Sequence, residues 1–442
     1  MESEIPTFPA HIVMGAFLIL LPSTWIAASR FKDNPTRFLI AAIWLRYLMS
    51  AFHEYTYSPI AGGLSLNALA SVILTAIGFA VVDKRLLKLK ALGAVYLMIA
   101  VLAVSAIANG RVEGVGSLAK WGYLITLTIA AYEALRRHGS VALFCGLLTV
   151  FLPPLALQLL SVVMGLGKGS EEDGSICFIG GYNHEAAFSI IVLTFLYCSC
   201  FLAPDKPRLT VLCIAAALLA LLLANYRTSL LAALPILAAI IFFGAIRRIS
   251  PSGRPVIVIV IGLAGAILLY ALASAMHQRF SDLFVVLSNS AGLLKPPEYY
   301  TEAEADLLSA RAIIWSRYIT AYLNGSVTNL ALGFGPESWD GVFSHYAHNT
   351  FVSVLYEAGL FGLVSLVYLF ALNFKLAMRT ASGRRPLIMG AHIGFFVLNL
   401  ATMPFWLIEG NVLLALTLAY TLHAQVLRRI RMPRMRLEMS TR

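Results

Sequence analysis

Charged residues are scarce in this chain of 442 residues: Asp, Glu, Lys and Arg make up 12%, whereas hydrophobic residues make up 59%. A soluble domain carries roughly a quarter charged residues, so this composition excludes an ordinary soluble globular protein. Apolar runs long enough to cross a hydrocarbon core recur along almost the whole chain. The sequence therefore predicts an all-α polytopic membrane protein with a single integral membrane domain, residues 1–442.

Two other features are missing. Residues 1–10 contain no Lys or Arg, which excludes the basic start of a secretory signal, so we expect the first apolar run to be a retained helix. Of the five cysteines only Cys177 lies outside the apolar runs, and no CxxC or Cys/His metal spacing occurs. These patterns exclude a disulfide framework and argue against a structural zinc site.

The apolar runs predict about 12–13 transmembrane helices. The expected spans are 11–29, 37–53, 64–82, 91–108, 118–135, 141–166, 184–203, 209–224, 229–246, 255–275, 348–374, 386–403 and 409–427.

The net charge of +11 follows the connections between these spans. Seven clusters in alternate connections hold 24 of the 33 Lys and Arg residues: 30–37, 84–90, 136–137, 206–208, 247–254, 375–385 and 428–442. Short basic loops stay in the cytoplasm, so the N-terminus is predicted outside and the C-terminus inside. The positive charge is a topology signal and does not indicate a nucleic-acid partner.

The largest outward segment is the loop 276–347. Thr301 and Glu304 have the form of a capping box, followed by apolar and aromatic residues at helical spacing as far as Asn324-Gly325. We expect this amphipathic helix to lie on the outer membrane surface. The acidic residues at its start are explained by the helix dipole, and the chain contains no Asp-x-Asp motif, so no metal is predicted.

Polar residues gather at the outward ends of the spans. Arg227 lies in the short break 225–228 between two apolar helices, against the positive-inside bias. His348 and Asn349 open one span, and His184 opens another. Arg311 and Arg317 lie on the loop helix, and Arg279 lies at the outer end of the tenth span.

Each of these residues also has a purely structural interpretation. Arg227 is compatible with an interfacial arginine that snorkels to lipid headgroups, and Arg311 or Arg317 with a solvated helix face. A lone histidine such as His348 is more often a structural hydrogen-bonding residue, whereas its neutral ring also suits a base near neutral pH. Glu357 lies about 13 Å deeper than His348 at 1.5 Å per residue, where a carboxylate is costly. Arg46 has the same difficulty, so the two are expected either to neutralise each other or to act in catalysis.

Several arginines beside one or two histidines at a membrane surface suit one kind of chemistry. Guanidinium groups bind phosphate with two parallel hydrogen bonds, and a nearby base activates a hydroxyl. This combination favours group transfer from a lipid-linked phosphate donor. A transporter vestibule that binds anions has similar residues.

The C-terminal half resembles the superfamily of bacterial O-antigen ligases and O-antigen polymerases. The motifs that carry the resemblance are Arg227-Thr228-Ser229, Arg311-Ala-Ile-Ile-Trp315, Leu332-Gly333-Phe334-Gly335-Pro336, His348-Asn349-Thr350-Phe351 and Leu355-Tyr356-Glu357-Ala358-Gly359-Leu360-Phe361-Gly362. They follow the family's order, and the last two blocks together are the most specific.

The resemblance implies a GT-C-like membrane glycosyltransferase in the bacterial inner membrane with a periplasmic active face, acting without metal or cofactor and with inversion. Its donor would be a glycan on undecaprenyl diphosphate. Arg227 and Arg311 would hold the diphosphate and His348 would serve the acceptor hydroxyl, as the catalytic set. Substrate-binding roles would fall to Arg279, Arg317, Asn349, His184 and Glu357.

Three functions are weighed. A polymerase for O-antigen or exopolysaccharide joins a lipid-linked chain to another saccharide, with a chain-length regulator as an expected partner. A ligase passes the chain to lipid A core. A lipid-linked oligosaccharide flippase or anion transporter would line a membrane-spanning path with charge, but here only Arg46 and Glu357 lie deep. The resemblance favours the polymerase.

The topology is testable by cysteine labelling. Ser326→Cys should react with an impermeant thiol reagent in intact cells whose outer membrane has been permeabilised, and Ser382→Cys should not, because all seven basic clusters lie on the side opposite to loop 276–347. Labelling only at position 382 would reverse the topology.

Overall fold

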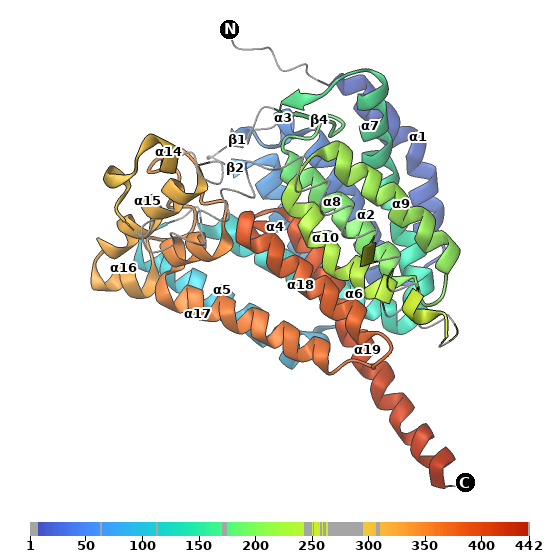
Figure 1. Cartoon of the computed structure of the whole chain (residues 1–442). Coiled ribbons are helices and arrows are strands. Elements are labelled where there is room, and N and C mark those ends of the chain that lie inside the picture. Colours follow the sequence, from blue (N-terminus) through green and yellow to red (C-terminus); the bar gives the residue numbers. More distant parts are fainter. Residues whose placement is uncertain are drawn as a thin grey trace.

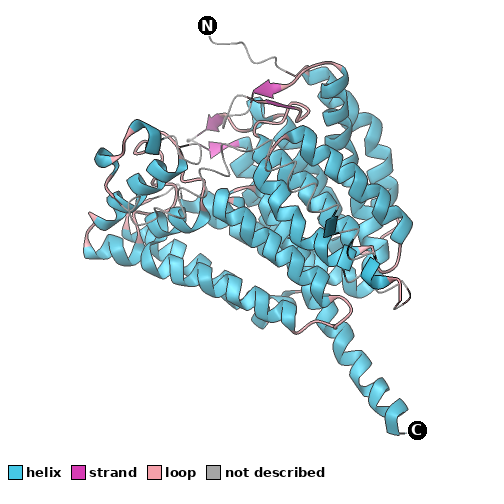
Figure 2. Ribbon diagram, in the orientation of Figure 1, coloured by secondary structure: helices cyan, strands magenta, loops and turns pink. Residues whose placement is uncertain are grey.

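A computed structural model describes residues 8–61, 64–111, 114–169, 175–242, 250, 252–256, 259, 262–263, 295–305 and 310–440. These residues form a helical bundle with two small antiparallel ribbons (Figures 1 and 2). The ribbons pair β1 (Pro59–Ala61) with β2 (Leu64–Ser65) and β3 (Lys168–Gly169) with β4 (Ile176–Cys177).

The helices follow the predicted apolar runs closely. Those before the large loop are α1 (Ala10–Ser29), α2 (Asn34–Ala51), α3 (His53–Thr56), α4 (Leu66–Val81), η1 (Lys84–Lys88), η2 (Lys90–Leu92), α5 (Gly93–Ala108), α6 (Gly114–Leu148), η3 (Thr149–Phe151), α7 (Leu152–Val163), α8 (Glu185–Phe201), α9 (Pro207–Ala224) and α10 (Arg227–Ile240). Those from the loop onward are η6 (Pro297–Tyr299), α14 (Glu302–Ala305), α15 (Arg311–Leu323), α16 (Val327–Leu332), α17 (Thr350–Met378), α18 (Arg385–Ala401), η7 (Pro404–Trp406) and α19 (Ile408–Ser440).

Twelve of the thirteen predicted spans coincide with described helices, while most of 255–275 lies outside the described residues. The fifth and sixth spans run together through α6, η3 and α7, with a break at Gly139 (φ 78°, ψ 170°). Within the described residues, six segments are long and apolar enough to cross a membrane: Ala10–Ser29, Lys90–Ala108, Gly114–Val163, Pro207–Ala224, Thr350–Met378 and Ile408–Arg428. The class predicted from the sequence, an all-α multi-pass membrane protein, is confirmed.

The two sets of connections lie at opposite ends of the bundle. Hydrogen bonds at the end predicted to face outward, the outer end, join Ser50 to Glu409, Tyr182 to Tyr47, Asn225 to Ser175, Tyr346 to His184 and Tyr226 to Ala401. Contacts at the inner end join Asp33 to His138, Asp83 to Glu133, Arg384 to Asp205 and Arg428 to Arg379. The start of α1 and the end of α19 lie on opposite sides of the bundle (Figure 1). The connections between helices therefore alternate between the two ends of the bundle, as the positions of the basic clusters predict.

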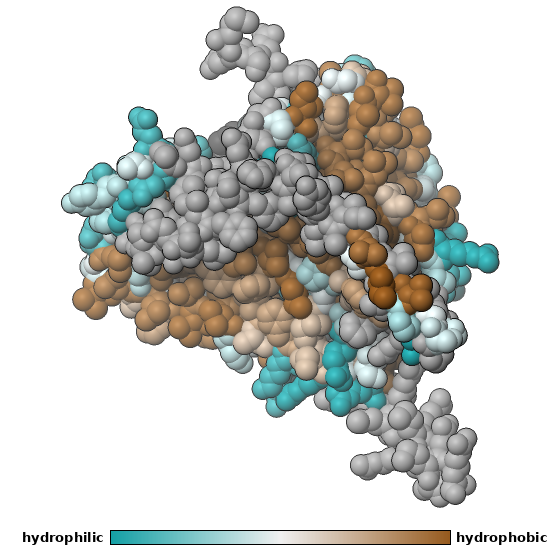
Figure 3. All heavy atoms as spheres, in the orientation of Figure 1, coloured by the Kyte–Doolittle hydropathy of each residue, from teal (hydrophilic) through white to brown (hydrophobic). Residues whose placement is uncertain are grey.

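Apolar surface is extensive on the bundle. Figure 3 shows hydrophobic side chains over α17 at lower left and over α1 and α9 at right, with hydrophilic groups at the far left and at the bottom. On α17, Leu360, Phe361 and Val364 are more than half exposed. Since water would disfavour such a face, it is the surface that lipid covers.

Helices α10 and α18 approach each other unusually closely. A Cβ added at Gly394 would lie 2.1 Å from the carbonyl oxygen of Ala232, and one at Gly390 would lie 2.6 Å from that of Pro235. Small residues let membrane helices meet backbone to backbone, which compensates for the weak hydrophobic drive in lipid. This contact fixes the start of α10 against the end of α18.

Helix α17 is broken at Gly359 (φ 66°, ψ −163°). The break releases carbonyl groups, and two of these accept hydrogen bonds from the glycine-rich turn: Phe334 N–H donates to Tyr356 (2.9 Å) and Gly335 N–H to Glu357 (3.0 Å). Ser105 on α5 donates its hydroxyl to the same Glu357 carbonyl (2.8 Å). The two sequence blocks 332–336 and 355–362 thus form one backbone junction, here called the α17 break.

The loop helix differs from the expected one. The capping box is present, with Thr301 N–H donating to Glu304 (2.9 Å), and Lys295 also binds this carboxylate. Instead of continuing to residue 323, however, the described helix is divided into α14 and α15, and α15 begins after Ala310 at φ 63°. A left-handed residue cannot continue an α-helix, so the expectation of one uninterrupted helix was wrong.

Replacing Gly359 by Ala should loosen the α17 break. The new Cβ would lie 2.5 Å from backbone atoms of Ala331 and Gly333, and the positive φ costs a side chain about 1–2 kcal/mol. We expect faster hydrogen exchange at the Phe334 and Gly335 amides. The matched control is Gly383→Ala, where an added Cβ meets nothing within 4 Å. Equal protection in both variants would show that the junction does not depend on this glycine.

Candidate functional site

His348 is held by fixed backbone on both sides. The indole N–H of Trp315 on α15 donates to the carbonyl of Ala347 (2.8 Å). On the other side Asn349 caps α17 by accepting N–H groups of its first turn (2.9 and 3.2 Å) and donates to the carbonyl of Leu400 (3.0 Å). His348 itself has φ 49°, which is strained for a residue with a side chain. Strain held by its surroundings in this way is found at functional sites.

The ring of His348 lies against Tyr346, with centroids 3.9 Å apart, and Tyr346 leads on to His184. The Tyr346 hydroxyl is 3.4 Å from Nε2 of His184. Nδ1 of His184 accepts the N–H of Ala186 (2.9 Å), so in the neutral ring the proton is on Nε2, beside the tyrosine. The structure therefore brings two predicted site residues, His184 and His348, to either side of one aromatic ring.

Arg311 comes to the same place through α15. It is the first residue of that helix and lies one turn before Trp315, so both are on one helix face. The hydroxyl of Tyr318 on the same helix donates to the carbonyl of His345 (3.0 Å), which secures α15 a second time to the segment before α17. Arg317 is exposed and lies on a different face of α15.

Arg227 approaches from the opposite side, across the outer end of α18. Asn225 ends α9 in the left-handed conformation (φ 52°), and Arg227 begins α10 two residues later, as the predicted hairpin tip requires. The hydroxyl of Tyr226 donates to the carbonyl of Ala401 (3.4 Å), next to the Leu400 carbonyl that Asn349 binds. The starts of α10 and α17 therefore meet at one helix end. Arg227, Arg311, His348 and His184 are called the Arg–His site below.

Asn349 and Glu357 have mainly structural contacts. Asn349 is a helix cap, and the buried Glu357 carboxylate accepts the hydroxyl of Ser353 (2.7 Å) and the N–H of Glu337 (3.0 Å). The expected pairing of Glu357 with Arg46 is wrong. Arg46 donates to the carbonyl of Asn67 (3.0 Å), and the nearby acid that acts on it is Glu409 on α19.

Two more facts complete the placement of the predicted residues. Arg279 lies outside the described residues. Among the residues that the structure describes, no group of three or more His, Cys, Asp and Glu side chains is arranged to hold a metal ion.

A family model described as O-antigen ligase matches residues 212–367. The resemblance to the O-antigen ligase and polymerase superfamily is confirmed. The matched segment contains Arg227, Arg311, His348 and the α17 break, whereas His184 lies before it. No curated protein matches the chain.

Lys120 and Glu337 were not among the site residues predicted from the sequence. Glu337 directly follows the motif 332–336, and Lys120 lies on α6. The Lys120 ammonium on α6 is 3.5 Å from Oε1 of Glu337, and Ser117 donates its hydroxyl to the same oxygen (2.8 Å). Glu337 has φ 60° and donates its own N–H to Glu357. This Lys120–Glu337 pair joins the glycine-rich turn, which lies inside the matched segment, to α6, which lies outside it. The sequence feature that could have indicated this pair is Lys120 itself, a basic residue near the predicted outer end of the span 118–135.

The charge state of Glu337 follows from these partners. Partial burial alone would raise its pKa, but the Lys120 ammonium and the Ser117 hydroxyl hold the pKa below the ordinary value of 4.5. Because the pKa is lower in the folded state, the pair stabilises the protein at neutral pH. That contribution is lost as the pH falls through the folded-state value.

Lys120→Met should therefore lower the stability of the purified protein at pH 7 by about 1.5–3 kcal/mol, the range for a hydrogen bond to a charged group. The difference in melting temperature from the unsubstituted protein should shrink as the pH falls through the lowered folded-state pKa of Glu337, where its carboxylate becomes protonated. Lys375→Met, at an exposed position near the inner end of α17, is the control. A constant difference at all pH values would exclude Glu337 as the partner.

Proposed function

We propose that this protein is a periplasmic-face glycosyltransferase that moves a glycan from undecaprenyl diphosphate to a saccharide acceptor, as a polysaccharide polymerase of the inner membrane. The observation that supports the proposal is the set of hydrogen bonds made by the neighbours of the Arg–His site: Tyr226 and Asn349 both bind carbonyl groups at the outer end of α18, and Trp315 on α15 binds the carbonyl of Ala347. The family match supports transfer chemistry of the O-antigen ligase and polymerase type.

The two arginines suit the donor. Each guanidinium presents donors in a planar fork that matches two phosphate oxygens. Both start helices, α10 and α15, whose N-terminal ends carry partial positive charge and add to the attraction for an anion. As the bond from sugar to diphosphate breaks, negative charge builds up on the departing diphosphate, and this arrangement stabilises it.

His348 suits the acceptor. The acceptor hydroxyl oxygen attacks the anomeric carbon from the face opposite to the diphosphate and forms the new glycosidic bond. The bond between that carbon and the diphosphate oxygen breaks, and its electron pair leaves with undecaprenyl diphosphate. The hydroxyl proton passes to the imidazole of His348 and then to solvent. Attack from the opposite face inverts the anomeric centre, and no step requires a metal ion.

Arg227→Lys should fail nearly as badly as Arg227→Ala, because lysine keeps the charge but loses the planar fork. Polymer yield in a deletion strain complemented with each variant is the measurement. Arg208→Ala, exposed at the inner end, should keep full yield. Full activity of the lysine variant would reduce Arg227 to a point charge or a lipid anchor.

His348→Ala should fold, insert and still bind the lipid-linked donor, but transfer about 10²–10⁴-fold more slowly, the usual contribution of a general base. Its control is His345→Ala, since that exposed ring is hydrogen-bonded to Ser344 and lies outside the Arg–His site. The assay is transfer from undecaprenyl-diphosphate glycan by purified protein. Unchanged turnover by His348→Ala would remove the histidine from catalysis, and inhibition by a chelator would contradict the metal-independent mechanism.

A further inference from the structure

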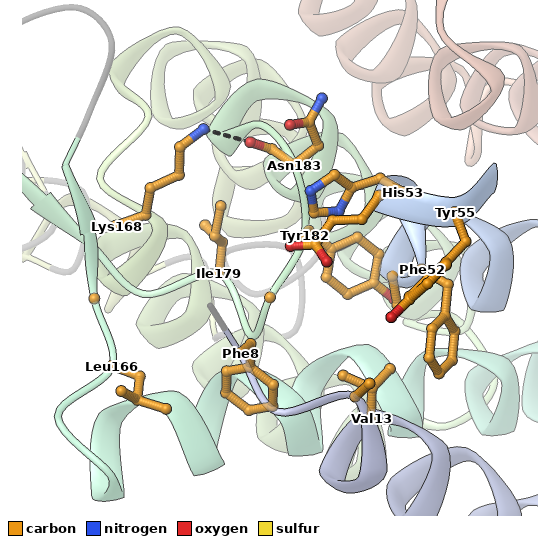
Figure 4. A pocket seen from close by; sticks show the side chains of 15 residues that line it. Phe8, Val13, Phe52, His53, Tyr55, Leu166, Lys168, Ile179, Tyr182 and Asn183 are labelled. Carbon is orange, nitrogen blue, oxygen red and sulfur yellow. Dashed lines mark hydrogen bonds between the residues drawn. The ribbon is translucent and has the colours of Figure 1, made fainter. Parts of the chain in front are cut away.

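A cavity of about 240 Å³ lies at the outer end, separate from the Arg–His site. Its walls come from the beginning of α1, from α3 with the end of α2, and from the two segments around 166–168 and 179–183. Figure 4 shows Lys168 on one side and His53 with Tyr182 on the other, with Phe8 near the base. Pockets for drug-sized ligands begin at about 300 Å³, so this one suits a smaller unit.

The lining combines aromatic surface with hydrogen-bonding groups of both kinds. Phe8, Phe52 and Tyr55 contribute rings, and Tyr55 is 65% exposed. His53, Glu54, Lys168 and Asn183 contribute polar groups: a carboxylate accepts, an ammonium donates, and an amide or imidazole does both. Nδ1 of His53 is buried without a hydrogen-bond partner among the described residues, although a buried polar atom normally has one.

This chemistry discriminates between ligands. Three polar or charged side chains, His53, Glu54 and Lys168, disfavour an acyl chain, for which each would have to lose its water. The Glu54 carboxylate repels a phosphate, and Lys168 already donates to the carbonyl of Asn183. A neutral sugar ring has apolar C–H faces that stack on aromatic rings, and hydroxyls that both donate and accept. It matches the lining on every side.

The cavity is joined to the Arg–His site through consecutive residues. Asn183 lines the cavity, and His184, whose Cα is about 3.8 Å further along the chain, contacts Tyr346 beside His348. A neutral imidazole such as that of His53 both accepts and donates a hydrogen bond, as a sugar hydroxyl does.

We propose that this cavity binds a neutral sugar unit of the acceptor saccharide while the reacting hydroxyl of that saccharide lies at the Arg–His site. For the identity of the saccharide, this inference rests on the proposed glycan transfer. The cavity then acts as a specificity site, because a sugar that fits the His53–Lys168 gap is held and a charged one is rejected.

The test uses the full chain in lipid nanodiscs and a panel of methyl glycosides of neutral hexoses, deoxyhexoses and N-acetylhexosamines. Saturation-transfer NMR should detect binding of at least one of them. Tyr55→Ala and Glu54→Gln should each weaken that signal at least fivefold, whereas Tyr299→Ala and Glu298→Gln, exposed and outside the cavity, should not. Absence of any bound glycoside, equal signals in all variants, or competition by inorganic phosphate would each overturn the proposal.

A transfer assay separates this inference from the proposed function. With lipid-linked donor, Tyr55→Ala should raise the acceptor KM at least fivefold and leave kcat unchanged, while Arg227→Ala should stop transfer and still bind the glycoside. Glycoside binding without any transfer by the unsubstituted protein would leave the cavity site standing and remove the proposed function. Normal transfer with identical acceptor KM in Tyr55→Ala would remove the cavity site alone.

Discussion

The geometry of the outer end depends on one backbone junction, the α17 break. A membrane helix cannot leave carbonyl groups unpaired in a medium without water, so an interruption needs donors from elsewhere. Here the donors are the N–H groups of Phe334 and Gly335, and the hydroxyl of Ser105 on α5. The glycine-rich turn and α5 thus supply the hydrogen bonds that the break in α17 needs.

The junction also determines where the loop after it can go. The turn leaves the junction at Glu337, whose N–H and carboxylate are bound by Glu357 and Lys120. Only eleven residues then separate Glu337 from Asn349, the cap of α17. Trp315 and Tyr318 hold α15 against this short segment. Arg311 is thereby carried toward His348 by contacts that involve neither of their side chains.

A second anchor is the outer end of α18, where carbonyl groups without partners in their own helix accept hydrogen bonds from Asn349 and Tyr226. The close approach at Gly390 and Gly394 holds α10 against the same helix. The starts of α10 and α17 are thus both tied to the outer end of α18.

The sequence by itself determined the membrane class, the positions of twelve described helices, the alternation of connections, the break before Arg227 and the resemblance to O-antigen ligases over residues 212–367. These conclusions depend on local features of the sequence, namely the length of apolar runs, basic loops and short motifs. Such features are independent of which helices pack together. The tertiary structure alone determined which polar side chains contact each other. Glu357 lies with Glu337 and Lys120 instead of Arg46, His184 meets Tyr346, and α14 is separated from α15. A buried charge takes whichever partner the neighbouring helix presents, and hydropathy carries no information about which helices are neighbours.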